Sequence, residues 1–256
     1  MTATLTTAQM VELMANPAHF ALWGKVKEGF RLISGQEWET RADYTHFWGL
    51  VREVHRLATG NEDIPATYLP SLAWMLGAHA GRMRKGIRRR PYFHHILMVV
   101  YLAWLLRMPS AYVLAAIHHD DPEDLPNHLG MLLEIVLAQI QHFGGDEVKE
   151  ICKGLTNTHA TKADKHASQI AKMQVYPMQT GILKLLDRIC NLADMRYDRP
   201  KDFDNPRLIK ECRQAIQLAN AMPKPAPDFV LALLAFSINR LAEENNFPLS
   251  ACFEDA

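Results

Sequence analysis

The chain has 256 residues, of which 48% are apolar and 22% are charged, a composition typical of a soluble globular protein that forms its core without disulfides or structural metals. Lys and Arg together number 28, as do Asp and Glu, so the formal net charge is zero and we expect neither nucleic acid nor an acidic membrane as a partner. The most apolar run, residues 96–106, is too short to cross a bilayer, which takes about 20 residues.

Apolar residues recur at helical spacing through almost the whole chain, and alternating, strand-like segments are rare. The sequence therefore predicts an all-α protein. The expected helices are residues 7–14, 19–32, 40–58, 67–85, 93–108, 110–119, 131–142, 146–155, 162–173, 179–195, 205–219 and 227–244. Pro109 ends one helix, Ser110 caps the next, and the pair Gly144-Gly145 breaks another.

The short polar segment at residues 60–65 is the best candidate for a boundary along the chain. It divides an N-terminal helical extension, residues 1–65, from a core at residues 66–200, and C-terminal helices at residues 201–256 are expected to pack on that core. We expect the large aromatic residues of the extension either to form additional hydrophobic core or to contact another copy of the chain in a homo-oligomer.

Two features bear on the cellular setting. The N-terminus has no basic segment followed by an apolar one, so the cytoplasm is the expected location. No Cys-x-x-Cys pair occurs among Cys152, Cys190, Cys212 and Cys252, which argues against a zinc knuckle and a redox motif. We expect free thiols in a reducing compartment.

Histidines are clustered at two places along the chain. His94-His95 opens one apolar helix, and His118-His119-Asp120-Asp121 closes the next. Imidazole and carboxylate groups at the end of a buried helix are unfavourable unless they are paired, and a divalent cation would satisfy them together. This mixed set of ligands suits zinc, manganese or iron(II). The alternative is that each histidine caps a helix or bonds to a backbone carbonyl.

A third acidic residue, Asp187, lies in an apolar helical segment. Asp187 and Asn191 are four residues apart and therefore share one face of the helix. An aspartate in such surroundings either ligates a cation or pairs with a basic side chain, here Lys184 or Arg188. Both interpretations remain open from this segment alone.

The order His95, then His119-Asp120, then Asp187 resembles the H…HD…D pattern of the HD phosphohydrolase superfamily. Three local motifs are similar to those of one branch, the RelA/SpoT-type alarmone hydrolases. They are PYxxH at residues 91–95, HDxxED at residues 119–124 and KLxDRxxN at residues 184–191. The resemblance covers about residues 75–196 and implies an HD-domain helical bundle over residues 66–200.

The resemblance also implies a mechanism and a set of site residues. One Mn²⁺, or another divalent metal, would be held by His95, His119, Asp120 and Asp187, and would lower the pKa of a water and polarise a phosphoryl oxygen. Glu123 and Asp124 would share the tasks of orienting or deprotonating the water and protonating the leaving oxygen. The implied substrate-binding residues are Arg84, Lys85, Tyr92, Arg188 and Asn191.

The substrate implied by the resemblance is (p)ppGpp, which would be hydrolysed to GDP or GTP and pyrophosphate. Residues 82–90 contain six basic side chains that could attract this anion, although a solvated turn or an RNA-binding patch has the same composition. The loop at residues 86–90 is about two residues longer than in the family. Asp121-Pro122 also replaces the usual Thr-Val.

The residues that follow the last motif are too few for a synthetase domain, so the resemblance favours a stand-alone small alarmone hydrolase. Such a protein could serve as an antitoxin to an alarmone synthetase. One alternative is an HD phosphohydrolase that acts on (p)ppApp or another nucleotide. A second alternative is a non-catalytic interaction module in which the metal site is vestigial.

Overall fold

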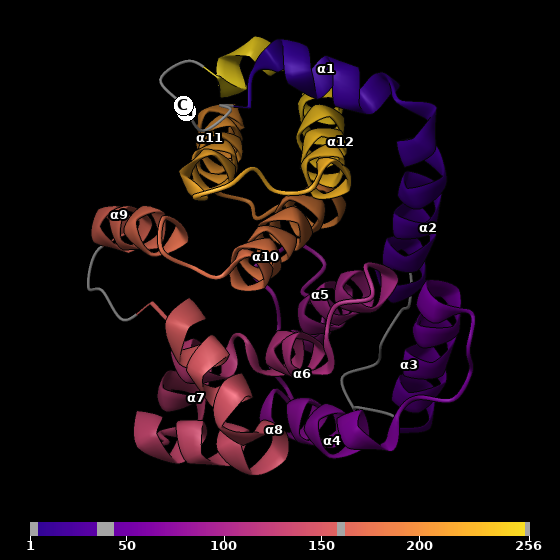
Figure 1. Cartoon of the computed structure of the whole chain (residues 1–256), viewed down its shortest axis with the longest axis vertical. Helices are drawn as coiled ribbons and strands as arrows, with labels where there is room; N and C mark the ends of the chain where they lie inside the picture. Colours follow the sequence, from indigo (N-terminus) through magenta and orange to yellow (C-terminus); the bar gives the residue numbers. More distant parts are fainter. Residues whose placement is uncertain (1–4, 35–43, 158–161, 254–256) are drawn as a thin grey trace. The chain divides into compact units, whose positions relative to one another are not determined.

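The computed structural model describes residues 5–34, 44–157 and 162–253 of the chain (Figure 1). Within these ranges the regular elements are helices, apart from one isolated antiparallel bridge between Met83 and Pro91. The elements are α1 (Thr7–Ala15), α2 (Pro17–Ser34), α3 (Tyr44–Thr59), η1 (Ala66–Tyr68), α4 (Leu69–Ala78), α5 (Phe93–Leu105), α6 (Ser110–His118), α7 (Asp121–Leu129), α8 (Leu133–Leu155), α9 (Lys162–Met173), α10 (Met178–Tyr197), α11 (Asn205–Ala221), α12 (Asp228–Asn245) and η2 (Leu249–Cys252). The all-α prediction is confirmed.

The chain divides into two compact units. The first unit comprises the described residues that lie within 1–26, 85–89 and 159–256. Its helix α10 packs against α11 and α12, while α1 lies on α12 and α9 on α11 (Figure 1). Trp23, in the first half of α2, stacks on Phe236 of α12 with ring centroids 4.9 Å apart. The apolar faces of these helices form the core of this unit.

The second unit comprises the described residues that lie within 27–84 and 90–158, and helix α5 is the element that packs against both α3 and α6. α6 packs in turn against α4 and α8 (Figure 1). Every residue of α5 except Leu105 is buried, which is expected of a helix that is apolar on all sides. The histidine pair at its start is therefore carried by the most buried helix of this unit.

Most predicted helices are present, and the differences have local causes. α4 ends at Ala78 instead of continuing to residue 85, because Gly81 adopts a left-handed conformation (φ 74°) and the following residues turn back to form the bridge to Pro91. The predicted break at Gly144-Gly145 is confirmed by the non-helical backbone of Gly145 (φ 81°, ψ −177°) inside α8. The expected start of the third helix, residues 40–43, lies outside the described residues.

Helix α7 is not among the helices predicted from the sequence, and it contains two prolines, Pro122 and Pro126. Pro122 lies in the first turn, where the backbone N–H that proline lacks would have no intrahelical partner. Three acidic residues in the same turn face the positive end of the helix dipole, and Gly130 ends the helix in a left-handed conformation (φ 66°).

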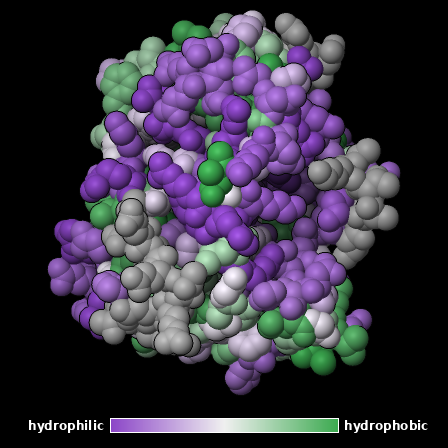
Figure 2. All heavy atoms as spheres, turned by 180° about the vertical axis from the view of Figure 1, so that it is seen from behind, coloured by the Kyte–Doolittle hydropathy of each residue, from purple (hydrophilic) through white to green (hydrophobic). Residues whose placement is uncertain are grey.

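The predicted domain limits at residues 65 and 200 remain a prediction. Among the described residues, no helix is both long and apolar enough to span a membrane. The face of the molecule drawn in Figure 2 is largely hydrophilic, with apolar residues in small separate groups.

Gly29 marks a close approach between α2 and α5. A Cβ atom at this position would lie 2.3 Å from the ring of Tyr101, which is fully buried and has little room to move. We expect Gly29→Ala to destabilise the protein by about 1–3 kcal/mol, although alanine is the better helix former. Urea unfolding would measure the change in the free energy of unfolding.

Gly24 of the same helix is the matched control, since no heavy atom lies within 4 Å of a Cβ built there. Gly24→Ala should leave the stability unchanged or raise it by up to about 1 kcal/mol. Equal stabilities of the two variants would contradict this account of the contact between α2 and α5.

Candidate metal centre

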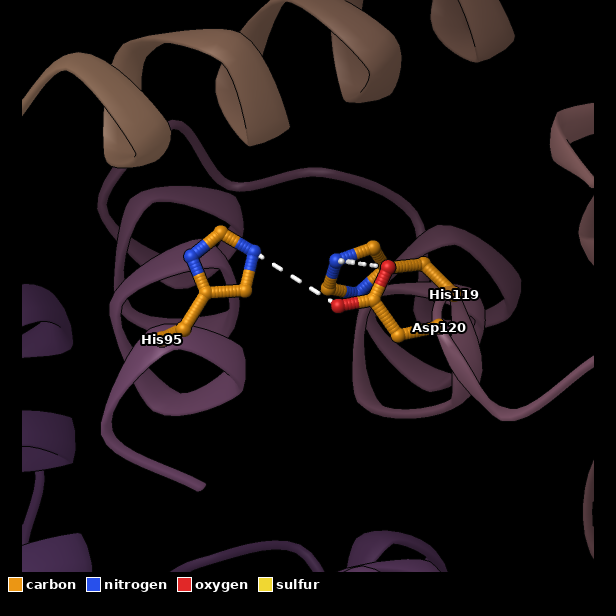
Figure 3. A group of neighbouring side chains, drawn as sticks. All are labelled: His95, His119 and Asp120. Atoms are coloured by element: carbon orange, nitrogen blue, oxygen red, sulfur yellow. Dashed lines mark ion pairs between the residues drawn. The ribbon is translucent and has the colours of Figure 1, made fainter. Parts of the chain in front are cut away.

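Three of the predicted metal ligands converge in the second unit. His95 lies in the first turn of α5, which begins directly after Pro91-Tyr92. His119 and Asp120 occupy the junction between α6 and α7, where His119 follows the last residue of α6 and Asp120 caps the start of α7. Figure 3 shows the three side chains pointing toward one another from these two places.

The distances suit a single cation. His95 Nε2 lies 3.7 Å from one carboxylate oxygen of Asp120, and His119 Nε2 lies 3.3 Å from the other. One ligand atom from each residue falls within 4.8 Å of those of the other two. Ligands at the usual metal–N and metal–O distances of about 2.0–2.2 Å lie about 3–4 Å from each other. In the described parts of the chain, no other group of three His, Cys, Asp or Glu side chains converges in this way.

The tautomer of His119 provides a separate test of the fit. His119 Nδ1 donates a hydrogen bond to the backbone oxygen of Ala116 (2.8 Å), because a carbonyl can only accept. In the neutral ring this leaves a lone pair on Nε2, which faces the carboxylate of Asp120. Two electron-rich atoms at this distance repel each other unless a cation lies between them. Histidines that bind metals are commonly oriented by such a backbone bond, so the residues fit a divalent metal.

Asp120 is held in place by Tyr92, whose hydroxyl donates to Asp120 Oδ2 (2.7 Å). Burial, assisted by the negative charges of Asp120 and Asp124, raises the pKa of the Tyr92 phenol well above its ordinary value. Tyr92 therefore remains a hydrogen-bond donor. The two histidines are buried, but the side chain of Asp120 is 20% exposed, so the site opens toward solvent on the aspartate side.

The outer members of the His118–Asp121 cluster do not join this group. The carboxylate of Asp121 is fully buried and accepts hydrogen bonds from His118 Nδ1 (2.8 Å), His79 Nε2 (2.8 Å) and Trp74 Nε1 (3.1 Å). Burial opposes ionisation of this group, but the bonds from His118 and His79 outweigh it and lower the pKa of Asp121. The structure thus corrects the expectation that one cation satisfies all four residues, since the outer two satisfy each other.

Ser71 extends this network, because its hydroxyl lies 2.9 Å from His118 Nε2. Ser71, His118 and Asp121 therefore have the connectivity of a Ser-His-Asp catalytic triad. All three side chains are fully buried, so no substrate can reach the hydroxyl. We interpret the network as a structural support for the α6–α7 junction.

The predicted acid and base residues lie in the first turn of α7, directly after the metal group. Glu123 accepts a hydrogen bond from the backbone N–H of Asn157 (2.7 Å). Asp124 forms an ion pair with Arg82 (2.8 Å), and Arg82 also donates to His79 Nδ1 (3.0 Å). Because arginine can only donate, the proton of the neutral His79 ring is on Nε2, where it bonds to the buried carboxylate network.

Two of the predicted substrate-binding residues lie beside this group. The guanidinium of Arg84 lies 5.4 Å from the centre of the Tyr92 ring, and that of Arg82 lies 4.0 Å from it. The ring of Tyr92 also stacks on His79, with centroids 5.1 Å apart. These contacts place two guanidinium groups at the ring of Tyr92, whose hydroxyl bonds to Asp120, and one of them, that of Arg82, is already paired with Asp124.

The remaining predicted site residues belong to the first unit. Asp187 Oδ2 accepts from Lys184 Nζ (2.9 Å) and its Oδ1 accepts from Asn191 Nδ2 (2.7 Å). Of the two basic residues that could pair with Asp187, Lys184 forms the ion pair. Arg188 instead donates a hydrogen bond to Gln169 (2.9 Å). Each oxygen of Asp187 keeps a second lone pair, so these bonds do not exclude ligation.

Lys85 is exposed at the start of the basic loop, residues 85–89, in the first unit. Asp198 at the end of α10 accepts from the backbone N–H of Arg88 (2.6 Å). A Cβ atom on Gly86 would lie 2.0 Å from this carboxylate, which explains the glycine at that position. The lengthened loop is therefore anchored to α10.

Sequence reasoning missed the residues that support the site. Trp74, His79 and Arg82 reach the α6–α7 junction from segments about 40 residues away, and no local pattern marks them. The sequence does contain one indication of these contacts. Asp121 follows two predicted ligands in a buried segment, and a buried carboxylate needs hydrogen-bond partners of its own.

The described fold is all-α, and the two buried histidines and the aspartate that converge in it are a set of donors suited to a divalent metal. The sequence profile of the family described as "HD domain" matches residues 71–220, more than half of the chain. The chain therefore belongs to the HD domain family.

A solved structure with a similar fold is described as that of a metazoan ortholog of SpoT that hydrolyzes ppGpp and plays a role in starvation responses. It superimposes with a TM-score of 0.58 and 16% sequence identity, over 73% of this chain and 99% of that chain. No curated protein sequence matches the chain. At this level of identity the structural likeness shows a shared fold, and the family membership supports a metal-dependent phosphohydrolase.

Proposed function

We propose that the protein hydrolyses (p)ppGpp at its 3′-pyrophosphate, giving GDP or GTP and pyrophosphate. The observation that carries this proposal is the convergence of His95, His119 and Asp120 next to the acidic pair at the start of α7. The motifs similar to those of alarmone hydrolases, including the one that contains Asp187, support the choice of substrate.

The metal set that we propose is His95, His119, Asp120 and Asp187, with Mn²⁺ as the metal. Asp187 enters on its place in the KLxDRxxN motif alone. When bound, a divalent cation would supply a water of lowered pKa and withdraw charge from the phosphoryl group.

The acidic pair performs the proton chemistry in this proposal. Glu123 and Asp124 follow Asp120 by one helical turn, and each is fixed by a separate partner, the Asn157 N–H and Arg82 respectively. Fixed carboxylates can orient the attacking water, accept its proton and return a proton to the leaving oxygen. The proposal divides these tasks between the two residues without assigning them.

The basic residues bind the polyphosphate. Arg84, Lys85 and Arg188 supply positive charge, and Asn191 supplies an amide for hydrogen bonding. Tyr92 contributes through Asp120, because its hydroxyl is already used in the bond to that carboxylate. The exposed side of Asp120 would face the phosphoryl group that reacts.

The test is anion-exchange analysis of ppGpp and ppApp incubated with the Mn²⁺-loaded protein. We expect ppGpp to be converted to GDP and pyrophosphate, and EDTA to abolish the reaction. Glu123→Gln and Asp124→Asn should retain stoichiometric metal but lose at least about 100-fold in turnover, which is the usual contribution of a general acid or base. Asp202→Asn, at an exposed site, is the matched control and should be fully active.

The other possible results of this assay would each contradict a different part of the proposal. Cleavage of ppApp alone would keep the hydrolase but change the base that it recognises. Intact substrates with one metal bound per chain would contradict the proposed substrate and favour a phosphohydrolase of another nucleotide, whereas intact substrates without bound metal would favour a non-catalytic module. If the two carboxamide variants kept full turnover, the assignment of the acidic pair would be wrong.

A further inference from the structure

A cavity of about 650 Å³ lies within the first unit. It is lined by the segment before α1, by the end of that helix, by the start of α2, by the end of α11 and by the start of α12. Sites that hold small organic molecules in proteins have volumes of about 300–1,000 Å³. Most of the lining residues are apolar, and Leu5, Leu13 and Leu231 are the largest of them. None of the residues proposed for the hydrolase lines this cavity.

The charged side chains that line the cavity are both acidic. They are Glu12 and Asp228, and no Lys, Arg or His is among the lining residues. Within the described parts of the chain, neither carboxylate forms a hydrogen bond or an ion pair. Lys224 is close to Asp228 along the chain, but it is exposed and does not line the cavity. The cavity therefore carries negative charge that no lining side chain neutralises.

Two helix ends add to this negative potential. α1 ends at Ala15 and α11 at Ala221, and neither helix has a basic residue in its last turn. The unsatisfied carbonyl groups at such an end are equivalent to about half a negative unit charge. His19 Nδ1 satisfies one of them, the backbone oxygen of Leu13 (3.0 Å). The start of α12 has the opposite sign, but Asp228 in its first turn offsets it.

The walls of the cavity are held by contacts within the protein. Asn220 Oδ1 accepts a hydrogen bond from the backbone N–H of Leu5 (2.7 Å), which joins the segment before α1 to the end of α11. Asn16 Oδ1 accepts from the backbone N–H of Ala18 (3.0 Å) at the start of α2. α1 also packs on α12 (Figure 1). A ligand that enters a pre-formed cavity of this kind orders few groups of the protein, which favours binding.

We propose that this cavity binds a small organic cation, an amine or quaternary ammonium compound with an apolar body. The apolar body contacts Leu13 and Leu231, and the cationic nitrogen faces Glu12 and the carbonyl groups at the helix ends. Charge complementarity selects this occupant, because the same potential repels an anion. An inorganic cation would leave the apolar wall without a partner. The site lies in the first unit and shares no residue with the metal group of the second.

The experiment uses the full chain and three probes that share an apolar chain and differ in their polar group, namely octylammonium, octanol and octanoate. Calorimetric titration at low ionic strength would measure the Kd of each. An exposed carboxylate and a helix end each change the affinity for a cation by a factor of about two to five. We therefore expect octylammonium to bind at least about tenfold more tightly than octanoate, with octanol between them. This preference should weaken at high salt.

Variants locate the site. Glu12→Lys should remove the preference for octylammonium, whereas Asp202→Lys, the same charge reversal at an exposed position outside the cavity, should keep it. Ala15→Trp fills the cavity from its exposed rim and should abolish binding of all three probes. Ala8→Trp is the matched control, because Ala8 is exposed on the same helix and does not line the cavity. It should bind octylammonium like the wild type.

The proposal is wrong if octanoate binds as tightly as octylammonium, or if no probe binds at millimolar concentration. It is also wrong if Ala15→Trp binds octylammonium like Ala8→Trp, because the cation would then occupy another site. Should Ala15→Trp fail to fold, the charge reversal at Glu12 decides the question. These readouts do not depend on any enzymatic activity, so they are separate from the test of the hydrolase.

Discussion

Asp120→Asn is expected to lose bound divalent metal and hydrolytic activity together. The carboxylate of Asp120 lies between the two histidine nitrogens, with one oxygen toward each, and it brings the negative charge among the three converging donors. Asparagine keeps the volume and one acceptor for the Tyr92 hydroxyl but removes that charge. Substitution of a residue that hydrogen-bonds to a metal ligand typically weakens metal affinity by about 10–100-fold. We therefore expect the loss of a ligand itself to weaken it by at least about 100-fold.

Metal content after dialysis and calorimetric titration with Mn²⁺ would measure this loss without any assumption about the substrate. Asp202→Asn, which removes an equal charge from an exposed position, should bind metal like the wild type. Circular dichroism should show the same helical content in both variants, since Asp120 is part-exposed. A full complement of tightly bound metal in Asp120→Asn would exclude this donor group as the metal centre.

Asp121→Ala is expected to have a large effect of another kind, on stability. The substitution removes the acceptor of two buried donors, the N–H groups of His79 and His118, and of the half-buried Trp74 N–H. Each unsatisfied buried group costs about 1–3 kcal/mol, and removal of one partner from a buried charged network costs about 3–5 kcal/mol. We therefore expect the free energy of unfolding to fall by about 3–5 kcal/mol, measured by urea denaturation.

Asp121→Asn separates charge from hydrogen bonding at this position. Its amide oxygen can still accept from one side, but its NH₂ group faces other donors, so the variant should lie between the wild type and Asp121→Ala. Stabilities of both variants within about 0.5 kcal/mol of the wild type, the range of neutral surface changes, would contradict the structural role of the network. Substitution of Asp120 is thus expected to reduce metal binding, whereas substitution of its neighbour Asp121 is expected to reduce stability.

The parts of this protein that could be predicted from its sequence depend on local patterns. The apolar spacing predicted the helices, and the doublets at the starts and ends of helices drew attention to His95, His119 and Asp120. The parts that could not be predicted depend on contacts between distant segments. Nothing near Asp121 indicates that Trp74 and His79 complete its surroundings. The sequence alone does not choose a partner for Asp187, because Lys184 and Arg188 both lie within one helical turn of it.

The burial of α5 has a consequence for how this centre would respond to a metal. Amide protons in a helix that is enclosed on all sides exchange with solvent mainly when the whole unit unfolds. His95 belongs to such a helix, α5, whose amide protons should exchange slowest in this unit. Asp120 is instead at a junction between two nine-residue helices, where separate opening requires less free energy. A cation that joins the two would add its binding free energy to the junction and bring the opening of α6 and α7 closer to the global limit set by α5.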